Sequence, residues 1–260
     1  MVSMFRQFIM TACALALAAT AHAAADPKAL LAASDAIRNP TKSFVLTTTL
    51  IEYRAGKQTD SNTLAIYSKP DPNGGQYRTL VRFLAPARET GKLMLKNGND
   101  LWFYDPSNQA SIRISPEQRL LGQASNGDVA TINLARDYSA KLTAEEDVTD
   151  GDRQTRHTNR LALVATVPEG VNYHHIDLWL DAKDARPVKA KFYSDSDRLL
   201  KTAYYRRYRN ELGVERPTET VIIDGLDPQW VTVMRFDAYA WRDIPETWLQ
   251  RDYLSRFHPE

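Results

Sequence analysis

The chain has 260 residues, of which 43% are hydrophobic and 25% are charged, and its formal net charge is +1. This length is enough for one large β domain with a sizeable core. A net charge near zero, with both signs mixed along the chain, argues against a general nucleic-acid-binding protein, so we expect no nucleic-acid partner.

The N-terminal 25 residues have the three parts of a secretory signal peptide. Arg6 gives the basic region, Phe8–Ala19 is a largely apolar run, and Ala21–Ala23 reads Ala-His-Ala, which suits a cleavage site. The run is shorter than the roughly 20 apolar residues that a membrane span needs. We therefore expect residues 1–25 to be a cleaved signal peptide and residues 26–260 to form a single β domain.

The one cysteine of the chain, Cys13, lies inside this N-terminal segment. Met10–Cys13 faintly resembles a lipoprotein box, but the apolar run continues beyond it, which favours an ordinary signal peptide over lipidation. After cleavage the chain has no cysteine, so the fold needs neither a disulfide nor a thiolate metal site.

A short helix is predicted at the start of the mature chain. Asp26 suits the N-cap position, the following proline suits the first helical position, and Asn39-Pro40 ends the helix. Leu30, Ala33 and Ile37 recur at helical spacing. We expect this face of the helix to pack on a sheet, because its apolar stripe is too narrow for a free-standing helix.

Strands are predicted next, at Ser43–Tyr53, Thr63–Tyr67 and Tyr77–Leu84. The short loops between them indicate antiparallel neighbours. Residues 93–113 then read as three further short strands. Asn97-Gly98 favours a hairpin turn between the first two of these.

The middle strand of this group, Leu101–Tyr104, reads Leu-Trp-Phe-Tyr and places apolar or aromatic side chains on both faces of the sheet. Asp-Pro-Ser-Asn at residues 105–108 turns the chain after it. A strand of this kind needs cover on both faces. One cover is the core, and the other is a lid or a ligand.

The strand pattern is interrupted at residues 115–134. Ser-Pro-Glu-Gln at 115–118 has a capping residue and a first-turn proline, so it predicts a short helix that contains Leu120 and Leu121 and ends at Gly122.

A polar and flexible loop is predicted at residues 123–127, followed by a second short helix. Asp128 can cap this helix, in which Val129 and Ile132 stack. The two helices are candidates for a lid over the sheet. The alternative is a loop that closes one end of the sheet.

From residue 137 onward the pattern is again that of strands. Lys141–Val148 is polar and acidic and reads as an edge strand. The further predicted strands are Leu161–Val167, Tyr173–Asp181, Val188–Tyr193, Leu199–Arg209, Thr218–Ile223 and Val231–Trp241. About a dozen strands joined mostly by short loops predict an antiparallel, strongly curved sheet rather than a βαβ fold. Ile244–Phe257 is predicted to end in a helix.

A search for catalytic chemistry finds no HExxH, CxxC, GxSxG or P-loop motif. His174 and His175 are adjacent on a predicted strand and point to opposite faces, so they cannot readily share a metal. Asp195 and Asp197 resemble part of a calcium loop, but they lie at a turn, where aspartate is common. We therefore expect no catalytic residue, no metal and no cofactor.

Tyr204–Arg209 alternates aromatic residues with arginines. A solvated strand is the favoured interpretation for an exported chain. Single-stranded nucleic acid and an anionic lipid or partner surface are the alternatives.

Two stretches resemble a known family. Asp100–Pro106, Asp-Leu-Trp-Phe-Tyr-Asp-Pro after a hairpin, is similar to the "LWFY-(N/D)-P" strand of the periplasmic outer-membrane lipoprotein carriers, the LolA-like lipoprotein-sorting family. Arg82–Pro86 and Gly91–Leu95 resemble the "F-x-x-P…G…L" run that precedes this strand in the wider family. The resemblance extends from about Arg78 to Ile114, and elsewhere it rests on strand order.

This resemblance implies a mainly β fold: an open, half-closed antiparallel β-barrel, with an N-terminal helix and short helices covering the concave face. It further implies a non-catalytic carrier in the periplasm that holds the acyl chains of a lipoprotein or other lipid for transfer toward the outer membrane. An inner-membrane exporter and an outer-membrane acceptor are the implied partners. A lipid- or partner-sensing binding module of the same fold and a secreted enzyme are the alternatives.

Burial of an acyl chain stabilises it by about 0.8 kcal/mol per methylene, so a carrier needs a dry concavity and a movable cover. We expect the cavity and its lid to be formed by apolar residues of the early strands and of the two predicted short helices. These residues are Leu46, Leu50, Leu64, Ile66, Val81, Phe83, Met94, Trp102, Tyr104, Leu120, Leu121, Val129 and Ile132.

Overall fold

The computed structural model describes residues 26–259, so the predicted signal peptide lies outside the described residues. The strands of its main sheet are β1 (Phe44–Arg54), β2 (Lys57–Lys69), β3 (Arg78–Ala85), β4 (Leu93–Asn97), β5 (Asp100–Asp105), β6 (Ala110–Arg113), β9 (Tyr138–Thr149), β10 (Thr155–Ala165), β11 (His175–Asp181), β12 (Pro187–Tyr193), β13 (Leu199–Glu211), β14 (Val214–Asp224) and β15 (Trp230–Trp241).

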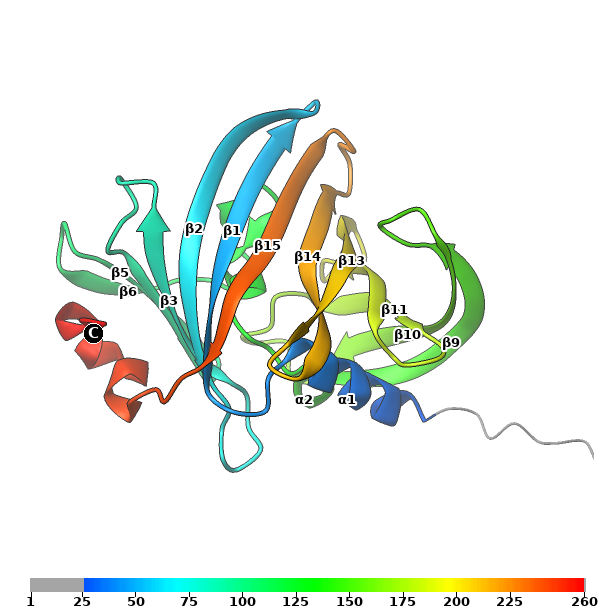
Figure 1. The fold of residues 1–260 in the computed structure, drawn as a ribbon, viewed down its shortest axis with the longest axis horizontal. Coiled ribbons are helices and arrows are strands. Elements are labelled where there is room, and N and C mark those ends of the chain that lie inside the picture. Colours follow the sequence, from blue (N-terminus) through cyan, green and yellow to red (C-terminus); the bar gives the residue numbers. More distant parts are fainter. Residues whose placement is uncertain (1–25, 260) are drawn as a thin grey trace, which may run out of the picture.

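These 13 described strands form one sheet in the order β6-β5-β4-β3-β2-β1-β15-β14-β13-β12-β11-β10-β9. Every described pairing in it is antiparallel. Strands that follow one another along the chain are neighbours in the sheet, except β6 and β9, which lie at its two edges; β1 and β15 pair across the rest of the chain. The sheet curls round, and its two edge strands, β6 and β9, are not paired with each other (Figure 1). The predicted open, half-closed antiparallel barrel is therefore confirmed.

The curvature follows from irregular strand pairing. The register shifts within the β1–β2, β1–β15 and β9–β10 pairs, among others. Each such bulge inserts an extra residue on one strand and increases the local twist, so long strands bend and the sheet wraps round a core. The predicted Asn97-Gly98 hairpin is present, with Gly98 at φ +59° between β4 and β5.

The structure extends several strands beyond their predicted limits. β2 begins at Lys57 rather than at Thr63, and β10 begins at Thr155 rather than at Leu161. The added residues are largely polar and exposed or half-buried, so they lack the apolar alternation that marks a strand. β9 lies at the edge of the sheet, as predicted from its polar, acidic sequence.

The N-terminal helix, α1 (Pro27–Arg38), is capped as predicted by Asp26, whose side chain accepts a hydrogen bond from the backbone of Lys28 at 3.0 Å. The predicted buried face is only partly right, because Leu30 and Ile37 are half-buried whereas Ala33 is exposed. The buried residues of the helix are Leu31, Ser34 and Asp35. Asp35 fixes this orientation, since its carboxylate accepts a hydrogen bond from the backbone N of Ala135 at 2.8 Å.

The connection from β6 to β9 differs from the two predicted helices. Residues 119–125 form a small hairpin of β7 (Arg119–Leu121) and β8 (Ala124–Ser125) in place of the first helix. A single 3-10 turn, η1 (Asn126–Val129), and one short helix, α2 (Leu134–Asp137), follow. Gly122, with φ +54°, forms the hairpin turn where a helix end was predicted.

The C-terminal segment forms two 3-10 helices, η2 (Glu246–Leu249) and η3 (Arg251–Arg256), which lie beside β3 and β5 at the left of the view in Figure 1. Their apolar residues pack with one side of the early strands in a single cluster. The buried members of this cluster are Ala65, Tyr67, Leu80, Leu93, Leu95, Tyr104, Ile244, Trp248, Leu249, Leu254 and Phe257. The outer face of β2–β5 is thereby covered by the chain itself.

The concave face of the sheet holds a second core, which we call the inner core. Its buried members are Phe44, Leu46, Leu50, Leu64, Ile66, Tyr77, Val81, Phe83, Met94, Leu101, Leu121, Ala124, Val129, Ala203, Ile222 and Met234. The half-buried ring of Phe192 joins it to a third cluster beneath α1 and β9–β11. Among residues 26–259, no helix is long and apolar enough to cross a membrane.

Candidate functional site

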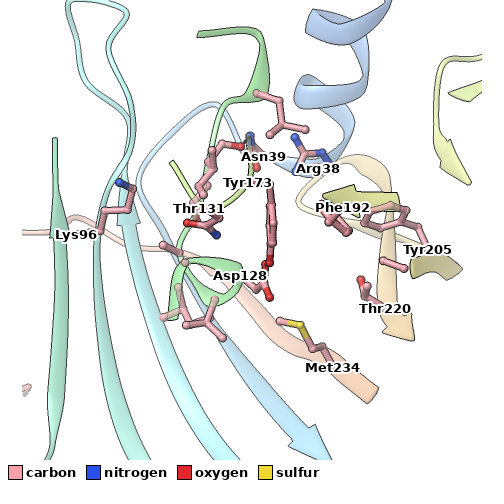
Figure 2. Close-up of a pocket in the computed structure, with 18 of the residues that line it drawn as sticks. Arg38, Asn39, Lys96, Asp128, Thr131, Tyr173, Phe192, Tyr205, Thr220 and Met234 are labelled. Carbon is pink, nitrogen blue, oxygen red and sulfur yellow. Dashed lines mark hydrogen bonds between the residues drawn. The ribbon is translucent and has the colours of Figure 1, made fainter. Parts of the chain in front are cut away.

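An apolar cavity of about 190 Å³ lies between the concave face of the sheet and residues 127–138. Leu46, Ile66 and Met234 belong to its sheet wall, and Val129 and Ile132 face them from the connection between β6 and β9. Figure 2 shows the ring of Tyr173 inside this space, with Thr220 and Met234 on the facing wall. The lining is mainly apolar, which suits a hydrocarbon ligand.

The predicted site residues fall into three groups. Leu46, Ile66, Val129 and Ile132 line the cavity itself. A second group lies in the inner core around the cavity without lining it, with Leu120 half-buried against that core and the others buried. The residues of this second group are Leu50, Leu64, Val81, Phe83, Met94, Leu120 and Leu121.

The third group is Trp102 and Tyr104, which were predicted to line the cavity, and this prediction is wrong. Both residues face the C-terminal segment on the outer side of the sheet, where Tyr104 is buried and the guanidinium of Arg251 lies 4.3 Å from the ring centroid of Trp102. The same strand instead directs Leu101 and Phe103 to the inner core. The second face of this aromatic strand is therefore packed against the C-terminal segment of the chain.

The segment that closes the concave face, residues 115–137, is called the cover here. Its residues 123–127 were predicted to be a flexible polar loop, and this prediction is wrong. Gln123 is 5% exposed and Asn126 is 5% exposed. The backbone N of Gln123 donates to Thr232 Oγ1 at 2.8 Å, and Asn126 Nδ2 donates to the Ser115 carbonyl at 3.1 Å. The polar loop is therefore a buried plug that hydrogen-bonds to β15 and to the start of the cover.

Two glycines allow this plug to lie close to its neighbours. A Cβ on Gly122 would lie 2.3 Å from Thr232 Oγ1, and φ at this glycine is +54°. A Cβ on Gly127 would lie 1.8 Å from Asn172 Oδ1. A larger residue at either position would therefore force the facing side chain, Thr232 or Asn172, or the plug itself to shift.

A polar network fastens the cover to the sheet. The ammonium of Lys201, on β13, pairs with the Asp128 carboxylate and donates to the Gln123 carbonyl at 2.8 Å. Tyr173 donates to the other carboxylate oxygen of Asp128 at 2.7 Å (Figure 2). The backbone N of Ser125 donates to Asp128 Oδ2 at 2.8 Å. We call this group the latch, because it joins the cover to β13 and to the residue 170–174 loop.

The electrostatics of the latch favour an ionised Asp128. Burial raises the pKa of this carboxyl, but the charge of Lys201 and the hydrogen bonds from Lys201, Tyr173 and Ser125 outweigh burial and lower the pKa. Burial lowers the pKa of Lys201, and Asp128 opposes that shift. Burial and the neighbouring Asp128 raise the pKa of Tyr173 well above its ordinary value, so this hydroxyl remains a donor.

A second and polar pocket lies beside the cavity. Its volume is about 510 Å³, and it shares Asn172, Tyr173 and Lys201 with the apolar cavity. These three residues are thus a common wall between an apolar and a polar compartment. The latch therefore lies at their boundary.

Sequence reasoning missed the residues of the latch. Asp128 was interpreted only as a helix cap, and Lys201 was not singled out. One signal was present, because alternation along β13 places Lys201 on the same face as Ala203, which is buried. A lysine on the inward face of a strand calls for a buried partner.

The described part of the chain holds no group of three or more His, Cys, Asp or Glu residues that could bind a metal ion. His175 lies 3.5 Å from Asp177 and 3.4 Å from Asp197, and its ring stacks on Tyr193.

The fold and the cavity define an open antiparallel barrel whose apolar interior is closed by the cover. A LolA superfamily protein from Nitrosomonas europaea has the same fold, with 33% sequence identity and a TM-score of 0.77. The match covers 87% of this chain and 98% of that chain. The chain therefore belongs to the LolA superfamily.

Two further solved structures share the fold. A DUF1329 family protein from Desulfovibrio piger is 20% identical with a TM-score of 0.74, and the match covers 88% of this chain and 97% of that chain. A domain from Vibrio parahaemolyticus, described as an outer membrane lipoprotein-sorting protein domain, is 18% identical with a TM-score of 0.73. The match covers 88% of this chain and 98% of that chain. A family model described as "Uncharacterized protein" matches residues 75–256. No curated protein matches the sequence.

Proposed function

We propose that the chain is a non-catalytic periplasmic carrier that holds an acyl chain of a lipoprotein or other lipid in the apolar cavity. The observation that carries this proposal is an apolar cavity inside the sheet, closed by a cover that a few polar contacts hold in place. Membership of the LolA superfamily and the description of the Vibrio parahaemolyticus domain support the same class of cargo.

The size of the cavity fits a carrier in its closed state. Sites for drug-sized ligands are typically about 300–1,000 Å³, whereas this cavity has about 190 Å³. The inner core continues beneath it through Leu50, Leu64 and Phe83, so movement of the cover would extend the apolar space along these strands. A full acyl chain therefore requires the cover to move.

The energy of chain burial can offset the loss of the latch. Removal of one partner from a buried ion pair costs about 3–5 kcal/mol, and this is an upper bound for separating Lys201 from Asp128. Burial of one methylene contributes about 0.8 kcal/mol, so about six methylenes offset the loss of the latch. Chains much shorter than this would leave the cover closed, while the chains of membrane lipids would open it.

We further propose that residues 1–25 are removed on export and that residues 26–260 work as one domain. An inner-membrane exporter would supply the cargo, and an outer-membrane acceptor would receive it. N-terminal sequencing of the exported protein should begin near Ala24 or Asp26. An intact Met1 on periplasmic protein would contradict this part of the proposal.

The decisive experiment fills the cavity from the sheet side. Ala203 is 2% exposed and lines the cavity, so Ala203→Phe places a ring in the space of the ligand. We expect affinity for a fluorescent C16 fatty acid to fall at least tenfold, which is about 1.4 kcal/mol. Ala240→Phe, at an exposed position of β15, is the matched control and should bind normally. Equal binding by both variants would place the ligand elsewhere.

A second candidate function is a lipid- or partner-sensing binding module, favoured by the arginines on the outer face of β13–β15. Glu219 is fully buried there and pairs with Arg206, Arg207 and Arg235. The side chains of Arg207 and Arg235 are 58% and 45% exposed, so an anionic partner could reach them. Arg206, predicted to be solvated, is instead 26% exposed and bound to Glu219.

Native mass spectrometry of the protein purified from its periplasm separates the two candidates. A carrier should retain a lipid that solvent extraction releases, whereas a partner sensor should retain a second polypeptide. A lipid-free monomer that also binds no added fatty acid would contradict the carrier.

A further inference from the structure

The polar pocket beside the cavity lies between the cover and the turn that joins β12 to β13. The cover contributes Glu117, Arg119 and Gln123, and the turn contributes Asp195 and Arg198. The loop before β11 contributes Asn172 and His174. An object in this pocket would thus touch the cover and the sheet at the same time.

Two buried amides that line this pocket have unused hydrogen-bonding atoms. Gln123 is 5% exposed, and its Nε2 has no hydrogen-bond partner among the described residues. Asn172 is 6% exposed, and its Oδ1 is likewise unpartnered within residues 26–259. Buried polar atoms are normally paired, and an unpaired one is costly. One donor and one acceptor in the residues that line the pocket are therefore left without a partner among residues 26–259.

The charged side chains of the pocket include two guanidinium groups. Arg119 is 58% exposed, lies 3.8 Å from Asp224, and places its guanidinium 4.2 Å from the ring centroid of Trp230. Arg198, in the part of the chain that the structure describes, makes no side-chain hydrogen bond or ion pair. Guanidinium groups bind phosphate oxygens through paired hydrogen bonds. The carboxylates of Glu117 and Asp195 line the same pocket and can accept hydrogen bonds from an amine.

We propose that this pocket binds the phosphate-bearing head group of an amphiphile whose acyl chain occupies the apolar cavity. Arg119, Arg198 and Gln123 Nε2 would hold the phosphate, while the two carboxylates and Asn172 Oδ1 would hold an amine, as in a phosphoethanolamine lipid. The inference rests on the proposed carrier function and names the class of lipid that the carrier selects.

The shared wall between the two compartments gives such a ligand a defined path. Lys201, Tyr173 and Asn172 face the apolar cavity on one side and the polar pocket on the other. A lipid with its head in one compartment and its chain in the other would cross this wall at the latch, which opens when the cover moves. Head group and chain would then be recognised on opposite sides of the same three residues.

The test compares two probes with the same C16 chain: lysophosphatidylethanolamine and a monoacylglycerol, which has no phosphate. The wild-type protein should bind the phospholipid at least about tenfold more tightly. Arg198→Ala and Gln123→Leu should each remove about tenfold of the phospholipid affinity and leave the monoacylglycerol affinity within about twofold. Arg88→Ala and Gln58→Leu, at exposed positions on other elements, are the matched controls.

A stability measurement separates a ligand role from a structural one. Gln123→Leu replaces a buried amide whose Nε2 is unpaired with an apolar group, so the melting temperature of the empty protein should stay the same or rise. A structural role for Gln123 would instead lower both the melting temperature and the affinity for both probes.

The outcomes distinguish the head-group site from the carrier function. Equal affinity for the two probes, or variants that weaken both probes alike, would overturn the head-group site and leave the carrier. Failure of both probes to bind would overturn the carrier and the head-group site together. Binding of chain-free glycerophosphoethanolamine as tightly as the lysophospholipid would overturn the link to an amphiphile.

Discussion

Replacement of Lys201 by methionine removes the positive charge of the latch while keeping the length of its side chain. The Lys201 side chain is 5% exposed and that of Asp128 is 14% exposed, so the pair is largely shielded from water. After the change, Asp128 keeps its hydrogen bonds from Tyr173 and Ser125 but has no counter-charge. The variant therefore leaves a buried carboxylate without a counter-charge.

The expected cost follows from this loss. Removal of one partner of a buried ion pair costs about 3–5 kcal/mol. The low end, about 3 kcal/mol, applies here because three hydrogen bonds to Asp128 remain and because methionine fills the volume of the lysine stem. With a urea m-value of about 3 kcal/mol per molar for a chain of this size, the unfolding midpoint falls by about 1 M.

Urea unfolding at pH 7 measures this effect, with Lys57→Met at an exposed end of β2 as the control. The difference in unfolding free energy between the wild-type protein and Lys201→Met should narrow as the pH falls from 7 to 4. Without Lys201, burial dominates and raises the pKa of Asp128, so protonation removes the buried charge within this range.

The double variant Lys201→Met/Asp128→Asn tests whether the loss of stability comes from the unpaired charge of Asp128. Because it removes both charges, it should be more stable than Lys201→Met alone. A loss below about 1 kcal/mol for Lys201→Met, or strict additivity of the two single changes, would refute a desolvated pair at this position.

Three further predictions concern other parts of the molecule. Leu121→Asp should lower the free energy of unfolding in urea by about 3–5 kcal/mol, because Leu121 is 9% exposed within the inner core. Leu226→Asp is the control and should cost little, since Leu226 is 81% exposed. A small loss of stability for Leu121→Asp would show a cover that leaves the sheet easily. Hydrogen bonds from Arg78 and Lys69 lower the pKa of Glu246 to about 2, so its stabilisation is present above pH 4.5 and is lost as the pH falls toward 2. The Glu246 side chain is 56% exposed, which limits this contribution to less than about 1 kcal/mol, and Glu246→Gln should flatten stability between these pH values; an unchanged slope would disprove it. A metal chelator should leave the melting temperature unchanged, and a large drop would point to a cation at Asp195 and Asp197.

Local patterns were sufficient to predict the class of fold. Short loops, turn residues such as Asn97-Gly98 and repeated apolar alternation specify antiparallel strands, because hairpins of this kind join only neighbours. The cap at Asp26 likewise depends on residues close in the chain. The family motif at residues 100–106 added the open barrel, which is confirmed.

Local sequence patterns could not predict which residues surround the cavity. Alternation shows that Trp102 and Tyr104 share one face of β5, but it does not say whether that face is inside or outside. The answer comes from the C-terminal segment, which covers the outer face from more than a hundred positions away: Asn97, for example, donates a hydrogen bond to the Leu249 carbonyl, 152 residues later. The buried face of α1 depends in the same way on Asp35 and its distant backbone partner.

The latch is the clearest case of a feature decided by tertiary structure. Asp128 and Lys201 are 73 residues apart, and each alone has an ordinary local explanation, as a cap and as a strand lysine. Their pairing exists because the chain between β6 and β9 folds back under the curved sheet. Sequence patterns report local periodicity, whereas the energy of a buried charge depends on which distant group meets it in a low-dielectric interior.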